Sequence, residues 1–203
     1  MKNKLWMILG IILLLSSCQS LKKVDKAAEN NGTTAKRINE EIREENQGQV
    51  ENTEVGKKTT IISKKDIKVE DKSDIFTVKV TGVQVSNMQP NKEGKKMFDS
   101  EKDNITVVTV AYDIENMTGD TYSLAPDKGK LTTNTGEEAQ AKNFLSDAVG
   151  GNFIGRVKKT GNVIYFLDGD PKKIDSIKLV IAPPLDAKDN SIGKEINLDI
   201  NLK

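Results

Sequence analysis

Beyond residue 73, hydrophobic and polar residues alternate over most of the chain with a period of two, the spacing typical of β-strands. The segment 196–202 is the clearest case, because every second residue is isoleucine or leucine and the residues between them are polar. Turn sequences rich in glycine, asparagine and aspartate separate such runs. Further runs occupy 75–86, 105–116, 163–167 and 175–182, with weaker candidates at 130–133 and 139–144. The pattern predicts an all-β, antiparallel β-sandwich of about seven strands over 73–203.

The run 75–86 changes phase in its middle. Phe76, Val78 and Val80 fall on even positions, whereas Val83 and Val85 fall on odd positions. Gly82 lies between the two sets. A β-bulge or bend at Gly82 would return both sets to one face of the sheet. We therefore expect a single bulged strand here.

The preceding segment has the composition of a linker. Residues 19–72 are polar, mixed in charge and free of aromatic side chains. Too little apolar surface is available to offset the entropy of ordering, so we predict a disordered tether over 18–72. A short helix from Thr34 to Glu45 is an alternative for part of it.

The first residues have the features of an export signal. Lys2 and Lys4 precede an apolar run from Leu5 to Leu15, which small residues follow. The run is shorter than the roughly 20 residues that a membrane-spanning helix needs. We therefore expect residues 1–17 to be a cleaved signal peptide.

The end of this signal, Leu15-Ser16-Ser17-Cys18, resembles the lipobox of bacterial lipoproteins. The resemblance implies that the Cys18 thiol receives a diacylglycerol and that Cys18 becomes the acylated N-terminus. Stable anchoring requires two or more acyl chains, which this modification supplies. The alternative is an ordinary secretory signal with an unrelated cysteine. On the lipobox interpretation, the protein is held at the extracytoplasmic face of the cell membrane by lipid.

Composition narrows the possible chemistry. The chain has no histidine and one cysteine, which excludes histidine-dependent triads and zinc sites of the histidine or cysteine type. Its 31 basic and 30 acidic side chains leave no strongly basic surface for nucleic acid. We predict no cofactor and identify no small-molecule substrate. The preference for lysine over arginine, with frequent asparagine, indicates an AT-rich genome and a Gram-positive host.

Several strand and turn sequences resemble a known family, the telokin-like, immunoglobulin-type domain found in Gram-positive surface lipoproteins and akin to a secreted mycobacterial antigen. The resemblance covers about 130 residues in order and implies an immunoglobulin-like β-sandwich. It implies a surface location, and it carries no established activity or site residues. The matching segments are Phe76–Val80, Val107–Asn116 with Thr118–Asp120, Leu131–Gly136 and Lys159–Phe166.

Three polar segments are candidate ligand sites. Asp168-Gly169-Asp170 places two carboxylates around a glycine, but Lys172 and Leu179 stand where a calcium loop needs oxygen ligands, so a tight turn is the better interpretation. The acidic residues of 99–103 lie in a polar loop whose own lysines at 95, 96 and 102 neutralise them, which favours a solvated loop over a weak divalent-ion site. The glycine-rich segment 150–155 lacks the motif of a phosphate loop. A loop or edge turn with Phe153 in the core is expected there.

The remaining prediction concerns function. We expect a non-catalytic binding or scaffolding module for an envelope protein, acting through sandwich loops or an edge strand. The alternative is a carboxylate-dependent cell-wall hydrolase, for which Asp113 and Glu115 are same-face candidates. The cations of 156–159 suit the attraction of anionic lipid or wall polymer, and the lysines of this segment equally suit the protection of an exposed edge strand. The candidate partner-binding loop consists of Phe153, Ile154, Arg156, Lys158 and Lys159.

Overall fold

The computed structural model describes residues 48–203, so the predicted signal peptide, Cys18 and the predicted helix from Thr34 to Glu45 lie outside the described residues. Within 48–203, no helix is long and apolar enough to cross a bilayer. One short α-helix, α2 (Lys92–Phe98), accompanies the strands. The strands are β1 (Val50–Thr53), β2 (Gly56–Lys72), β3 (Phe76–Pro90), β4 (Ile105–Asn116), β5 (Thr121–Leu124), β6 (Lys130–Thr133), β7 (Glu138–Gln140), β8 (Gly151–Ile154), β9 (Lys158–Leu167), β10 (Ser176–Ile181) and β11 (Ile196–Asn201).

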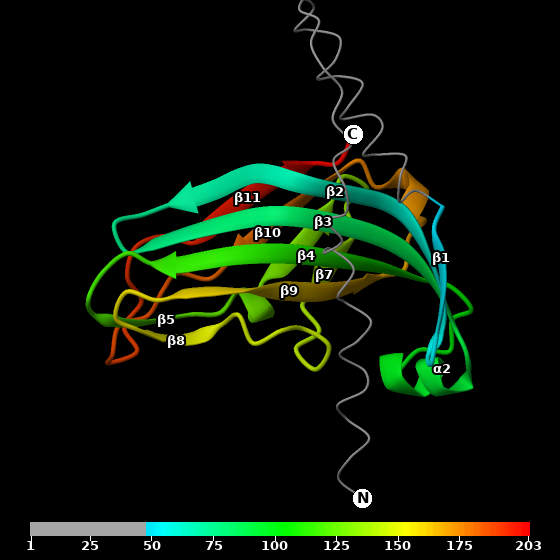
Figure 1. Ribbon diagram of the computed structural model, residues 1–203, viewed down its shortest axis with the longest axis horizontal. Helices are drawn as coiled ribbons and strands as arrows, with labels where there is room; N and C mark the ends of the chain where they lie inside the picture. Colours follow the sequence, from blue (N-terminus) through cyan, green and yellow to red (C-terminus); the bar gives the residue numbers. More distant parts are fainter. Residues whose placement is uncertain (1–47) are drawn as a thin grey trace, which may run out of the picture. The chain divides into compact units, whose positions relative to one another are not determined.

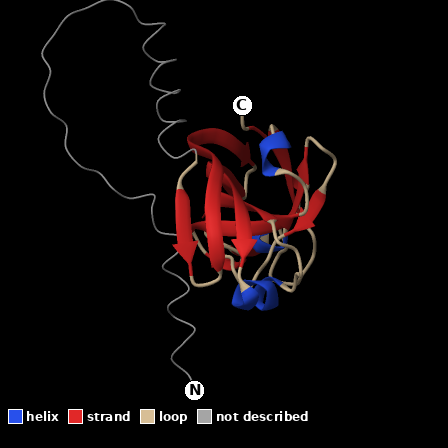
Figure 2. Cartoon of the chain, turned by 90° about the vertical axis from the view of Figure 1, so that its right-hand side faces the viewer, coloured by secondary structure: helices blue, strands red, loops and turns tan. Residues whose placement is uncertain are grey.

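The strands form an antiparallel sandwich, which confirms the predicted fold class. A large sheet has the order β1-β2-β3-β4-β9 and a smaller one the order β11-β10-β6-β7, while β5 and β8 pair separately. Figure 1 shows β2, β3, β4 and β9 side by side in front of β10 and β11. Figure 2, turned by 90°, shows the strands in two facing layers. The sequence predicted the sandwich, although it predicted fewer strands.

The strands with the clearest alternation are confirmed. The predicted run 105–116 coincides with β4, and 175–182 and 196–202 correspond to β10 and β11, which pair from Ser176 with Asn201 to Ile181 with Ile196. The bulge expected at Gly82 is also present, because Val80 pairs with Tyr112 whereas Gly82 pairs with the next residue, Ala111. Thr81 is therefore the extra residue.

The predicted boundary of the tether is wrong at its carboxyl end. Residues 56–72 form β2, the longest strand with 17 residues, and β1 pairs with its first part. Pairing with β3 satisfies the backbone of β2, and a bulge after Lys65 lets Ile67 enter the core, where it is 7% exposed. The folded domain therefore begins before residue 50. Beyond the part paired with β1, β2 is an edge strand of the large sheet, and it carries many lysines because its unpaired side faces solvent.

Three smaller differences concern short elements. The sequence analysis did not predict β5, and it interpreted β8 as a loop or edge turn. The weak candidate 139–144 is a strand only in β7. The chain then leaves the sheet and follows the edge of β9, with Lys142 N donating to Ile164 O and Asp147 N to Asn162 O. This segment protects that edge of the large sheet from further pairing.

The core occupies the space between the sheets, and a second cluster lies on the opposite face of the large sheet. Valines and other apolar residues of β3, β4, β9, β10 and β11 fill the first. In the second, Val55, Met88, Phe98 and Ile105 pack together, and Phe98 meets Phe166 edge to face at 5.1 Å between ring centroids. Helix α2 covers this second cluster at one end of the sandwich.

Candidate functional site

The predicted partner-binding loop is partly folded into the domain. Phe153 lies in β8, is fully buried, and packs edge to face on Phe76 with 5.0 Å between ring centroids. The ammonium of Lys159 lies 4.3 Å from the centroid of the same Phe153 ring, a cation–π arrangement. The expectation that Phe153 enters the core is confirmed. In this conformation its ring is therefore not available to a partner.

The three cations of this loop bind groups of the same chain. Arg156 Nη2 donates to Met117 O at 2.8 Å, and Lys159 Nζ donates to Gly150 O at 2.6 Å. Lys158 Nζ forms an ion pair with Asp113 at 2.7 Å, and this hydrogen bond raises the pKa of Lys158. Ile154, with 77% of its surface exposed, is the apolar group that this loop presents to solvent. Partner binding by this loop stays a prediction.

A buried asparagine holds this end of the sandwich together. Asn116, the last residue of β4, is 0% exposed, and its amide nitrogen donates to Asp120 O, Phe153 O and Gly155 O at 2.9, 3.3 and 2.9 Å. Its side-chain oxygen accepts from the backbone nitrogen and the hydroxyl of Thr118. One side chain thus fixes the turn after β4 and the loop after β8 against each other.

The carboxylates considered for hydrolysis lie on the outer face of the large sheet. Asp113 and Glu115 lie on β4 opposite Lys79 and Thr77 of β3, on the face of the large sheet turned away from the main core. Asp113 is engaged by Lys158. Neither residue lines the pocket described next.

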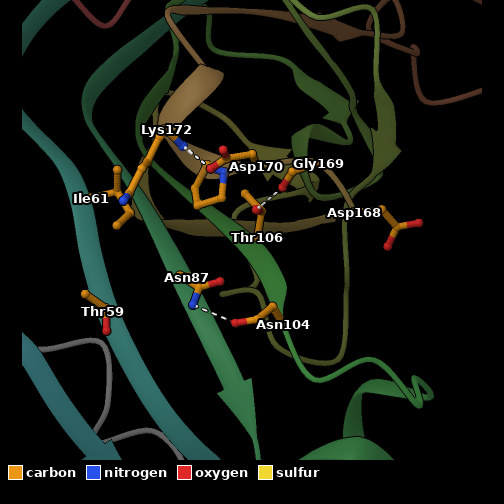
Figure 3. Close-up of a pocket in the computed structure, with 10 residues that line it drawn as sticks. Thr59, Ile61, Asn87, Asn104, Thr106, Asp168, Gly169, Asp170 and Lys172 are labelled. Atoms are coloured by element: carbon orange, nitrogen blue, oxygen red, sulfur yellow. Dashed lines mark hydrogen bonds between the residues drawn. The ribbon is translucent and has the colours of Figure 1, made fainter.

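A pocket of about 530 Å³ opens at the other end of the sandwich, on the inner side of the large sheet. Thr59, Asn87 and Thr106 come from three adjacent strands and are cross-strand neighbours, since Thr59 pairs with Asn87 and Asn87 with Thr106. The loop after β9 forms the facing wall (Figure 3). The full lining is Thr59, Ile61, Asn87, Asn104, Thr106, Asp168, Gly169, Asp170, Pro171 and Lys172.

The wall formed by 168–172 is anchored from two sides. The carboxylate of Glu137 accepts hydrogen bonds from the backbone nitrogens of Asp168 and Gly169, the latter at 3.0 Å. The Thr106 hydroxyl donates to Gly169 O at 2.5 Å. A side chain on Gly169 would collide with Glu137, because an added Cβ would lie 2.6 Å from its Oε2. These contacts hold the wall in place without a ligand.

The opposite wall carries a group of amides. Asn87 Nδ2 donates to Asn104 Oδ1 at 3.0 Å, and Gln89 Nε2 reaches the same oxygen at 3.5 Å. The Asn104 oxygen therefore accepts two hydrogen bonds, while its own amide nitrogen remains for other acceptors. Together with the threonine hydroxyls, these groups suit the recognition of a polar ligand.

The Asp168-Gly169-Asp170 segment forms the turn expected from the sequence. Asp168 pairs with Lys102 at 2.6 Å, and the Asp170 side chain accepts from Lys172 N at 3.0 Å, where it begins a short 3₁₀ turn. Among residues 48–203, no group of three or more histidine, cysteine, aspartate or glutamate side chains is arranged to hold a metal ion.

The sequence analysis did not identify this pocket. Thr59 and Ile61 lie in the segment assigned to the tether, and Asn87, Asn104 and Lys172 belong to separate turns and strand ends. The available signal was the β-branched run Thr59–Ile62, which has strong strand propensity.

Comparisons with known proteins connect the chain to lipoproteins of unknown function. No known protein-family profile matches it. The SPbeta prophage-derived uncharacterized lipoprotein YonS of Bacillus subtilis is 28% identical over 149 residues, which are 72% of this chain. The match spans 66% of the length of YonS.

Two solved structures are similar in fold. A functionally unknown protein from Listeria monocytogenes superposes with a TM-score of 0.57 at 15% identity, covering 73% of this chain and 89% of that protein. The putative lipoprotein ycdA of Bacillus subtilis reaches a TM-score of 0.46 at 17% identity over 67% of this chain and 39% of its own, which is too low to establish a common fold. The chain is therefore similar in sequence to a Gram-positive lipoprotein and in fold to a protein whose function is also unknown.

Proposed function

We propose that this chain is a membrane-anchored extracytoplasmic lipoprotein whose β-sandwich is a non-catalytic binding or scaffolding module for an envelope partner. The likeness to the lipoprotein YonS supports the anchoring, as does the Leu15-Ser16-Ser17-Cys18 sequence. The antiparallel sandwich is compatible with the telokin-like, immunoglobulin-type domain that the strand sequences resemble, and we include that assignment in the proposal.

The observation that carries the binding role is the preformed pocket at the end of the sandwich. Its walls come from three strands and one loop, and the loop is fixed by backbone hydrogen bonds donated to the Glu137 carboxylate and by one that the Thr106 hydroxyl donates. A site whose walls are ordered beforehand loses less conformational entropy when it binds. A volume of about 530 Å³ falls within the range of about 300–1,000 Å³ that is usual for ligand pockets.

The same geometry favours binding over hydrolysis. A hydrolase of the predicted type needs two carboxyl groups facing one substrate bond. The two acids of the pocket have other partners, since Asp168 pairs with Lys102 and Asp170 caps the turn at Lys172. Figure 3 shows the Asp168 carboxylate directed away from the other labelled side chains.

The proposal is tested by site-specific photocrosslinking in living Gram-positive cells. The full chain carries a photoreactive residue at position 61 in the pocket, at 154 on the predicted loop, or at the exposed Lys178 of β10 as a control. We expect a discrete adduct with one envelope component from position 61 and none from 178. The Cys18→Ser variant should be released from the membrane and lose the adduct.

Two results would contradict the proposal. An adduct pattern at 178 equal to that at 61 would show random contact, and the absence of any adduct at 61 would remove the pocket as the binding site. A discrete adduct at 154 alone would move the binding role to the predicted loop.

A further inference from the structure

We propose that the pocket binds an oxyanion of its ligand, a carboxylate or a phosphate group, through Lys172 and the side-chain amide of Asn104. The inference rests on the proposed binding function and specifies the ligand chemistry of that site.

The hydrogen-bond donors of the pocket remain available to a ligand. Lys172 takes part in none of the ion pairs found among residues 48–203. The oxygen of Asn104 accepts hydrogen bonds from Asn87 and Gln89, which leaves its amide hydrogens for a ligand. The hydroxyl of Thr59 adds a third donor to the same lining.

The acids of the pocket, in contrast, are already engaged by groups of the protein. Lys102 holds Asp168 at 2.6 Å, and this carboxylate points away from the amides in Figure 3. Asp170 accepts from the backbone nitrogen of Lys172 and so serves the wall itself. A cationic ligand would compete with Lys102 for Asp168 and would be repelled by the ammonium of Lys172. An oxyanion instead gains a charge-assisted hydrogen bond from Lys172.

Lys172 is also positioned by the fold. It follows Asp170 and the buried Pro171 in the short 3₁₀ turn, so its backbone is held by the cap and by packing. Figure 3 shows its side chain extending from this turn toward Ile61 of β2, across the pocket from the wall that carries it. Lys173, the next residue, does not line the pocket. This pair of lysines supplies a matched control.

The test follows the backbone amide signals of the isotope-labelled full chain, solubilised in detergent, during titration with inorganic phosphate and with acetate. Sodium chloride at matched ionic strength measures the effect of screening alone. We expect saturable shifts at Thr59, Asn87, Asn104 and Lys172 with the oxyanions only. Lys172→Gln and Asn104→Leu should each weaken the binding about tenfold or more, and Lys173→Gln should leave it within about twofold.

Comparison of phosphate with acetate identifies which group the pocket prefers. Shifts of the same size with chloride, or equal weakening by Lys173→Gln and Lys172→Gln, would overturn the inference, because both indicate nonspecific attraction to surface charge. The absence of saturable shifts would overturn it as well. If crosslinking at position 61 succeeds while these titrations fail, the binding function stands and only the assignment of the ligand group is wrong.

Discussion

Replacement of Asn116 by alanine should strongly destabilise the domain. The side chain is fully buried at the end of β4 and joins two loops that are distant in sequence, the turn at 117–120 and the segment 153–155. Alanine removes every one of these hydrogen bonds and leaves the buried carbonyl of Phe153 and the partly buried carbonyls of Asp120 and Gly155 without this donor. We therefore expect the effect to exceed that of an ordinary surface substitution.

The expected loss in the free energy of unfolding follows from the number of hydrogen bonds that the substitution removes. The amide has two hydrogens for three carbonyl oxygens, so its donors provide about two full hydrogen bonds, and its oxygen accepts two more from Thr118. At about 1 kcal/mol for each of four bonds, with some relaxation of the turn, the loss should be about 3 kcal/mol. For a domain of this size, the corresponding decrease in Tm is about 6–12 °C.

Denaturant unfolding followed by circular dichroism measures this loss. Asn143→Ala is the control, because Asn143 is exposed and its side chain forms no hydrogen bond found within 48–203. If Asn116→Ala lowers the free energy of unfolding by less than about 0.5 kcal/mol, the reasoning is refuted. Asn116→Asp should be less stable at pH 7 than at pH 4, because a buried carboxylate would face carbonyl oxygens and only its protonated form can donate a hydrogen bond.

Three other changes test separate parts of the structure. Burial raises the pKa of Tyr165 from 10.0 to about 12, so the contribution of its neutral form to stability is complete below pH 10 and is lost between pH 10 and 12. Tyr165→Phe should reduce this alkaline loss of stability, which is measured as the free energy of unfolding against pH. Gly94→Ala should destabilise the packing of α2, since its Cβ would lie 2.0 Å from Val55 O, and Tm should fall relative to Lys96→Ala. Glu137→Gln should speed hydrogen exchange at the amides of Asp168 and Gly169 while exchange in β10 stays unchanged, and unchanged exchange at 168–169 would contradict the anchoring role.

The sequence alone determined the features that depend on local periodicity. The alternation in 105–116 and 196–202 gave strands with the observed buried face, because a period of two places every second side chain on the same side of a sheet. The phase change at Gly82 located the bulge, since only an inserted residue keeps both hydrophobic sets inside. The sequence also predicts that Phe153 enters the core, because removal of a large aromatic side chain from water is favourable, and this side chain is fully buried.

The tertiary structure alone decided where the folded domain begins and where its pocket lies. The lysine-rich segment 56–72 has too few apolar residues to indicate a strand of the sandwich, and it becomes one because β3 supplies its hydrogen bonds and the core accepts Ile67. The pocket brings Thr59, Asn87 and Thr106 together through strand register and sets them against the loop that Glu137 holds. Such contacts depend on which strands pair and in which register, and neither is encoded in the local alternation of any one segment.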